Sequence, residues 1–211
     1  SYCGKKINKK KLAQKSIFFE QKILNEVVGS QDQIAASYGG FNKIIFNPGG
    51  SFKVKPFLLK EKIINQLNSN LILLYTGFKR TAHDIASGYI NKLQSSKKTN
   101  IMNILNLARE GEKALTDNKL YDFAALLHES WLEKRELDKS ISTTKIDEIY
   151  STAMKKGALG GKLLGAGGGG FFLFYVPFHK QRNFIKYFKK FITVPFKFSD
   201  QGSKIVLRDI N

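Results

Sequence analysis

Apolar positions along the chain follow two spacings, one helical and one strand-like, and together they predict the elements of the fold. Apolar residues three or four positions apart predict helices over 9–27, from Lys79 onward, over 101–115, 120–131 and 146–153, and around 184–192. Short apolar runs predict strands at 43–46, 70–75 and 171–176, with further strands near 196–198 and 204–207. The segment Asn47-Pro-Gly-Gly-Ser51 predicts a turn. Because helices and strands mix without strict alternation, the pattern favours the α+β class.

The composition predicts a folded core and argues against a membrane protein. The chain has 211 residues, of which 42% are hydrophobic, and this is ample for a core. No run of eighteen apolar residues occurs, so no membrane span is expected. The first residues, Ser1 to Ile7, lack the apolar stretch of a signal peptide. The single cysteine, Cys3, allows no intrachain disulfide, which fits a reducing cytosol. A cytoplasmic protein is therefore expected.

The net charge of +18 raises the question of nucleic acid as a partner. However, 30 of the 35 basic residues are lysine and five are arginine, whereas base and phosphate recognition favours arginine. The lysines are spread along the chain, with modest clusters at 5–15 and 180–190. This distribution argues against nucleic acid and favours solvated lysines, while a phosphorylated ligand stays open as an alternative.

A glycine-rich segment is the most distinctive feature of the sequence. Residues 157–170 hold eight of the eighteen glycines, and the apolar run 171–176 follows directly. Residues 165–170 spell GxGxxG, but a dinucleotide-binding fold needs that pattern after a strand and before a helix. Here a predicted strand follows it, and no Walker lysine is present. The backbone amides could line a phosphate, or the segment could be a structural turn into the strand.

Two carboxylates stand out near the N-terminus. Glu20 lies on the apolar stripe between Ile17 and Leu24, where a charge is costly unless it is paired or binds a metal. A lysine partner and a divalent-ion ligand are both compatible with that position. Asp32 lies in a polar segment before the small-residue run 35–37. It could cap the following helix, act as a general base, or orient a hydroxyl nucleophile.

Three segments together resemble the GHMP kinases, the superfamily of galactokinase, homoserine kinase, mevalonate kinase and phosphomevalonate kinase. Residues 162–170, KLLGAGGGG, are similar to the third motif of that family, KxxGAGxGG, and residues 29–33, GSQDQ, to the segment that holds its catalytic aspartate. Residues 29–42, 74–82 and 162–177 are most similar to bacterial heptose 7-phosphate kinases. The resemblance implies a ferredoxin-like mixed sheet with helices over 61–211, and a remnant of the N-terminal kinase domain over 1–60.

The resemblance also implies an activity, its cofactors and its site. The expected reaction moves the γ-phosphate of ATP to the anomeric hydroxyl of a sugar 7-phosphate, in a nucleotide-activated heptose pathway. Asp32 is then the base or orienting carboxylate, and Glu20 the ligand of Mg²⁺. The phosphate region is expected at Gly165, Ala166, Gly167, Gly168 and Gly169. Contacts to the substrate's own phosphate are expected from Thr76, Lys79 and Arg80, because a dianion needs fixed positive charge.

One part of the family pattern is missing from the sequence. The family's ATP loop, of the PxGLGSS type, lies upstream of the segment that begins here, and no GLGSS occurs in the chain. The chain is therefore expected to be the C-terminal part of a kinase, to need the missing N-terminal half as a partner, and to be inactive alone. The alternatives are a non-catalytic remnant, a basic binding module, or a GHMP kinase for a different sugar.

Overall fold

A computed structural model describes residues 7–79, 82–93 and 95–206, and the chain divides into two compact units. The first unit combines Ser1–Leu58 with Phe198–Asn211, and the second is the continuous segment Leu59–Lys197. Helices and strands occur in both units, so the predicted α+β class is confirmed. The expectation of a mixed sheet is wrong, because all strand pairs of the described residues are antiparallel.

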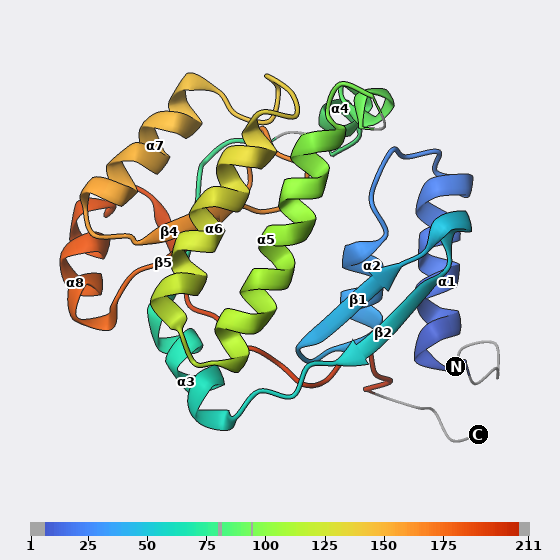
Figure 1. Cartoon of the computed structure of the whole chain (residues 1–211), viewed down its shortest axis with the longest axis horizontal. Coiled ribbons are helices and arrows are strands. Elements are labelled where there is room, and N and C mark those ends of the chain that lie inside the picture. The colour runs from blue at the N-terminus through green and yellow to red at the C-terminus, as the bar shows by residue number, and fades with distance from the viewer. Residues whose placement is uncertain (1–6, 80–81, 94, 207–211) are drawn as a thin grey trace. The chain divides into compact units, whose positions relative to one another are not determined.

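The first unit packs two helices against a two-stranded hairpin (Figure 1). Its elements are helix α1 (Lys9–Phe18), the π-helical turn η1 (Phe19–Ile23), helix α2 (Gln31–Tyr38), strand β1 (Asn42–Phe46), the 3₁₀ turn η2 (Pro48–Gly50) and strand β2 (Phe52–Pro56). The small core joins Ala13 of α1, Ile34 of α2 and Phe52 of β2. The predicted strand at 43–46 and the predicted turn at 47–51 are confirmed.

The first predicted helix ends earlier than its apolar stripe. The side chain of Asn8 caps α1 by accepting the Lys11 amide at 2.8 Å. After Phe18 the hydrogen bonding widens, and the Leu24 amide reaches the Phe19 carbonyl, five residues back. Asn25 then takes a left-handed conformation, with φ 53°, which ends the helical path. The prediction of a helix through residue 27 is therefore wrong beyond residue 23.

The second unit is built on a four-stranded antiparallel sheet with the order β4-β5-β3-β6. Its strands are β3 (Leu71–Tyr75), β4 (Gly160–Leu163), β5 (Phe171–Tyr175) and β6 (Ile192–Val194). The two central strands pair in register with Leu73 opposite Leu173. The strands predicted at 70–75 and 171–176 are confirmed. The strand predicted near 196–198 is wrong, because β6 lies at Ile192–Val194 instead. No strand forms over 204–206, and residue 207 lies outside the described residues.

Helices cover this sheet and close its core (Figure 1). They are α3 (Glu61–Asn70), the short α4 (Ala82–Ser87), the 3₁₀ turn η3 (Ile90–Lys92), α5 (Lys98–Thr116), α6 (Leu120–Arg135), α7 (Thr144–Lys155) and α8 (Phe178–Tyr187). Helices α5 and α6 run side by side, and α6 contacts the edge strand β4. Helix α8 ends at Tyr187, so the helix predicted around 184–192 is wrong in its last turn.

Aromatic side chains fill the core of the second unit. Trp131 is fully buried and meets the ring of Phe172 edge-on, with ring centroids 5.6 Å apart. Phe172 in turn stacks on Phe174 at 4.9 Å. Each fully buried large apolar side chain contributes about 1.5–3 kcal/mol. The core therefore fixes β5 beneath α6 and α7, and the glycine-rich segment enters this strand. Within the described residues, no helix has the length and apolar character that crossing a bilayer requires.

Candidate functional site

The glycine-rich segment forms the loop that joins β4 to β5. Its tightest points are Gly167 and Gly169. Gly167 has φ +125°, and a Cβ placed there would lie 2.8 Å from the Ile141 Cα. A Cβ on Gly169 would lie 2.6 Å from the Phe78 carbonyl oxygen. Because real Cβ atoms do not approach neighbouring backbone so closely, these two positions require glycine.

Two neighbouring segments hold the loop by backbone hydrogen bonds. The Gly168 amide donates to the Ile141 carbonyl at 2.8 Å, and the Gly170 amide to the Phe78 carbonyl at 3.0 Å. The Thr76 amide and hydroxyl both donate to the Gly170 carbonyl at 2.9 Å. The loop is thus fixed between the end of β3 and the connection from α6 to α7.

The five residues of the predicted phosphate region, 165–169, all lie in this loop. Gly167, Gly168 and Gly169 are buried in it, while Gly165 is exposed and Ala166 partly buried.

Thr76 is 2% exposed. Its hydroxyl donates to the Gly170 carbonyl and accepts a hydrogen bond from the Phe78 amide. Lys79 is exposed and directly follows Phe78, whereas Arg80 lies outside the described residues. The ligand contacts of these three residues stay predictions.

The sequence did not predict a role for Lys162, the first residue of the glycine motif. The Lys162 ammonium donates to the Ser130 hydroxyl of α6 at 3.0 Å. Burial against α6 lowers the pKa of Lys162 from its ordinary value. Lys162 therefore joins β4 to α6.

The connection from α6 to α7 is ordered by Asp138. Its Oδ1 accepts the Ser140 amide at 2.9 Å and the Ser140 hydroxyl at 2.8 Å, and its Oδ2 accepts the Lys92 ammonium at 3.0 Å. The bonds from Ser140 and the contact with Lys92 lower the pKa of Asp138 to about 2. The same turn presents the Ile141 carbonyl to Gly168. A carboxylate outside the glycine motif therefore helps to shape the loop.

Replacing Asp138 with Asn is expected to destabilise the protein in a pH-dependent way. The pKa of Asp138 is lower in the folded protein than its ordinary value of 3.8. Its contribution is therefore complete above pH 4 and is lost as the pH falls towards 2. At pH 6 the variant should lose about 1 kcal/mol of unfolding free energy, since the Lys92 pair is partly solvent-screened. Urea unfolding at pH 6 and pH 2.5 measures the difference, and an equal loss at both values contradicts the prediction.

In the first unit, Glu20 lies within the π-helical turn, and its partner is an amide rather than a lysine. The Gln33 Nε2 donates to the Glu20 Oε2, and Gln33 is 7% exposed. The Gln33 Oε1 is buried and, within the described part of the chain, has no hydrogen-bond partner. Single π-helical turns often occur at functional sites. A hydrated cation beside Glu20 would supply the water that this orphaned oxygen lacks.

Asp32 immediately precedes Gln33, so the segments that hold the two predicted carboxylates meet in one unit. It is exposed in the first turn of α2, and Ser30, rather than Asp32, occupies the cap position. A carboxylate there is stabilised by the positive end of the helix dipole. In the described ranges no three His, Cys, Asp or Glu side chains come together as a metal site. A single carboxylate such as Glu20 is compatible with Mg²⁺, which commonly takes one or two carboxylates plus substrate phosphates.

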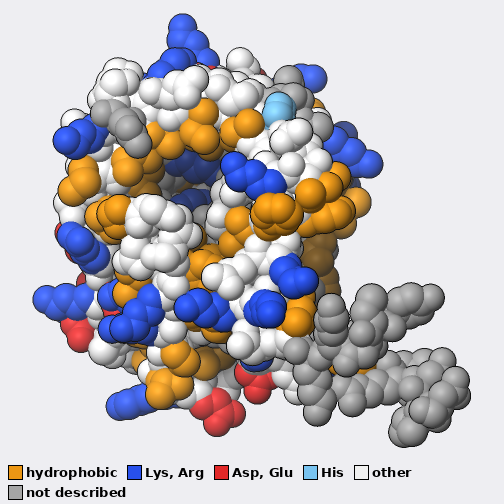
Figure 2. Space-filling model, turned by 90° about the vertical axis from the view of Figure 1, so that its right-hand side faces the viewer, with side chains coloured by type: hydrophobic (Ala, Val, Ile, Leu, Met, Phe, Trp, Pro, Cys, Tyr) orange, Lys and Arg blue, Asp and Glu red, His pale blue; other side chains and the backbone are white. Residues whose placement is uncertain are grey.

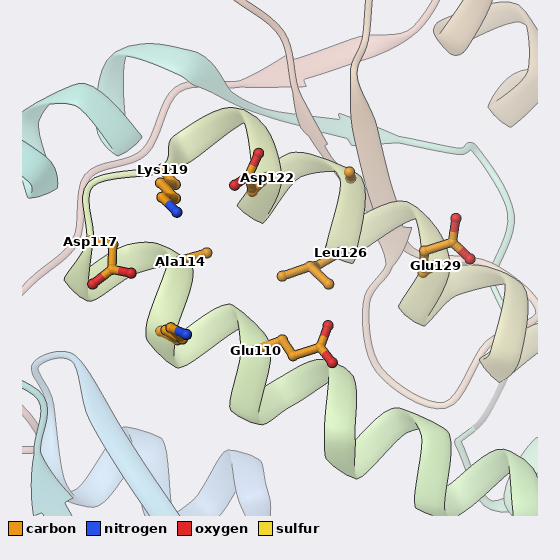
Figure 3. Close-up of a pocket in the computed structure, with 9 residues that line it drawn as sticks. Glu110, Ala114, Asp117, Lys119, Asp122, Leu126 and Glu129 are labelled. Atoms are coloured by element: carbon orange, nitrogen blue, oxygen red, sulfur yellow. The ribbon is translucent and has the colours of Figure 1, made fainter.

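A pocket that the sequence did not indicate lies between α5 and α6 (Figure 3). It measures about 390 Å³, and acidic side chains, two lysines and apolar side chains line it. Its lining includes Glu110, Asp117, Asp122 and Glu129. None of the predicted site residues lines it, so this pocket is separate from the glycine loop.

Basic side chains are dispersed over the face of the molecule that Figure 2 shows. Figure 2 shows lysine and arginine at many separate points of one face, with apolar and uncharged side chains between them. This agrees with the distribution of lysine along much of the sequence.

Comparisons with known proteins find similarity to kinases. Residues 112–191 match the sequence model of the family described as GHMP kinases C terminal. Over 196 residues the chain is 32% identical to D-glycero-alpha-D-manno-heptose 7-phosphate kinase of Campylobacter jejuni, covering 92% of this chain and 58% of that protein. Over 160 residues it is 29% identical to the bifunctional fucokinase/GDP-fucose pyrophosphorylase of Arabidopsis thaliana, covering 72% of this chain and 15% of that protein.

Solved structures agree in fold. A D-glycero-D-manno-heptose 1-phosphate kinase from Bacteroides thetaiotaomicron superposes with a TM-score of 0.74 at 24% identity, covering 98% of this chain and 58% of that chain. A putative sugar kinase from Campylobacter jejuni gives a TM-score of 0.68 at 27% identity, covering 95% of this chain and 58% of that chain. The chain therefore spans less than two thirds of the length of these relatives.

Proposed function

We propose that the chain is the C-terminal part of a sugar kinase acting on a heptose 7-phosphate, since residues 112–191 match the family model described as GHMP kinases C terminal. The proposed reaction transfers the γ-phosphate of ATP to the anomeric hydroxyl. The observation that carries the proposal is the 32% identity over 196 residues to the heptose 7-phosphate kinase of Campylobacter jejuni. That similarity covers 92% of the chain and so reaches both units.

In this proposal Asp32 accepts or orients the proton of the anomeric hydroxyl. Its exposure at the start of α2 supports the assignment, because a base must reach its substrate. Glu20 would hold Mg²⁺, with the orphaned Gln33 Oε1 accepting from a water of its shell. When bound, the ion neutralises charge on the phosphates.

The glycine loop would line the phosphates of the bound substrates. Backbone amides in a loop of mixed left- and right-handed residues form anion-binding concavities. Thr76 would hold the loop through its hydrogen bond to the Gly170 carbonyl. Lys79 and Arg80 would add positive charge for the phosphate of the sugar.

Phosphoryl transfer also needs a cradle for ATP, and we propose that another segment supplies it. No GLGSS sequence occurs in the chain. Catalysis of this reaction depends almost entirely on positioning and on electrostatic stabilisation of the phosphates. The chain alone is therefore expected to show little or no turnover.

A substrate panel tests the proposed function. ATP-dependent phosphorylation would be measured with the chain alone, and with the chain joined to the part of the Campylobacter jejuni relative that it does not match. The completed protein should phosphorylate heptose 7-phosphate with a kcat/KM about 100-fold above that for the unphosphorylated heptose, because the phosphate makes charge-assisted hydrogen bonds. Preference for galactose or mevalonate would assign a different substrate. If the completed protein folds and binds ATP but shows no turnover, the proposed kinase activity is rejected.

A further inference from the structure

Lys134 at the C-terminal end of α6 contacts the start of the glycine loop, at residues other than those that Phe78 and Ile141 bind. Its ammonium donates to the Leu163 carbonyl at 3.0 Å and to the Gly165 carbonyl at 2.5 Å. Both acceptors are backbone oxygens two residues apart, so a single side chain spans the point where β4 becomes the loop. No motif in the sequence points to this lysine, because it lies 31 residues before Gly165.

These two bonds determine the direction of the peptide groups at the start of the loop. In a planar trans peptide the carbonyl of one residue and the amide of the next point in opposite directions, and the described residues contain no cis peptide. The first peptide follows this rule, with the Leu163 carbonyl on Lys134 and the Leu164 amide on the Phe171 carbonyl at 2.9 Å. By the same geometry, the bond to Gly165 turns the Ala166 amide away from α6.

The Ala166 amide is therefore oriented but not occupied. The amides of Leu164, Gly168 and Gly170 donate to backbone carbonyls around the loop. Within residues 7–79, 82–93 and 95–206, no backbone or side-chain oxygen accepts a hydrogen bond from the Ala166 amide. Ala166 is only partly buried, so part of the residue is open to solvent. An amide that is fixed, accessible and unpaired is a donor that an anionic oxygen would complete.

We propose that Lys134 is a positioning residue of the glycine loop, which holds the Leu163 and Gly165 carbonyls so that the Ala166 amide is fixed as a donor to a phosphoryl oxygen. This inference deepens the proposed function and rests on it for the identity of the ligand. Lys134 does not touch the phosphoryl group in this arrangement. It acts through the backbone, and its positive charge also lowers the electrostatic cost of an anion in the loop.

Amide hydrogen exchange of the chain tests the positioning without requiring turnover. Lys134→Met keeps the apolar stem of the side chain and removes its donor. Exchange of amides 164–170 should accelerate about tenfold or more, because two charge-assisted hydrogen bonds are lost. Lys134→Arg restores a donor and should return exchange to within about threefold of wild type. Lys119→Met removes the same charge beside the other end of α6 and should leave the loop amides unchanged. Wild-type exchange in Lys134→Met overturns the proposal.

Pyrophosphate binding, measured by calorimetry on the same proteins, tests the donor role. Pyrophosphate should protect the loop amides of the wild-type chain, and Lys134→Met should bind it about tenfold more weakly. An equal loss in Lys134→Met and Lys119→Met would show an effect of net charge and overturn the donor role, as would absence of protection. A negative kinase assay beside positive loop results would reject the proposed function and leave Lys134 as the residue that orients the loop.

Discussion

The variant Gly160→Ala is expected to unfold far more easily than the wild-type protein. Gly160 begins the edge strand β4, and a Cβ there would lie 1.8 Å from the Ala124 carbonyl oxygen of α6. Neither backbone can yield locally, since Ala124 is fully buried. Helix α6 would have to move away from the sheet, taking Trp131 out of its packing with Phe172. Such overpacking should cost at least about 3 kcal/mol, or roughly 6–12 °C in Tm.

Gly111→Ala is the matched control for this prediction. Gly111 lies within α5 in the same unit, and its added Cβ would make only ordinary contact with the Phe123 ring at 3.8 Å. Alanine in a helix interior should stabilise the protein by about 0.5–1 kcal/mol. Trp131 is the only tryptophan, so its fluorescence reports unfolding of this unit. Equal stability of the two variants would show that α6 does not approach β4 as described.

Replacing Asp32 with Asn is expected to lower kcat of the completed kinase by about 10²–10⁴-fold. Asn keeps the size of the side chain but cannot accept the proton of the sugar hydroxyl. The KM values for ATP and for the heptose 7-phosphate should change little, because Asp32 is proposed to act on the reacting hydroxyl and not on the phosphates. Steady-state kinetics with both substrates varied separates the two effects.

Glu26→Gln is the control for Asp32→Asn, because Glu26 is an exposed carboxylate of the same unit. It removes the same charge and should retain wild-type kcat. Asp32→Asn should remain folded by circular dichroism, since a charge at a helix N-terminus contributes only about 0.3–1 kcal/mol. Wild-type turnover in a folded Asp32→Asn would remove Asp32 from the proposed mechanism.

The sequence predicted the elements whose apolar pattern is strong. The central strands β3 and β5 are continuous apolar runs, and α5 and α7 carry clear helical stripes. Strand β4 was missed because two of its four residues are glycine, which carries no side chain to show an alternating pattern. Strand β6 was absorbed into the preceding helix, because Ile192 continues the spacing of α8. In both cases contacts distant in sequence decided the structure.

The candidate site was predictable only where a local motif carries it. The glycine loop was identified from its composition, and its proximity to Thr76 is present in the structure. The roles of Asp138 and Lys134 could not be foreseen, since each acts through backbone groups that only the fold brings near. The amide partner of Glu20 was missed for the same reason, as Gln33 follows thirteen residues later.

The return of the C-terminal segment to the first unit has a consequence for the order of folding during synthesis. The Gly40 amide donates to the Ser199 carbonyl at 2.8 Å, and the Ser203 amide to the Ala36 carbonyl at 2.8 Å. These partners are made more than 150 residues apart on the ribosome. The second unit is continuous in sequence and can fold as soon as it emerges, whereas the first unit needs residues 199–203, which are made later. Within this chain, the first unit is thus begun before the second unit and completed after it.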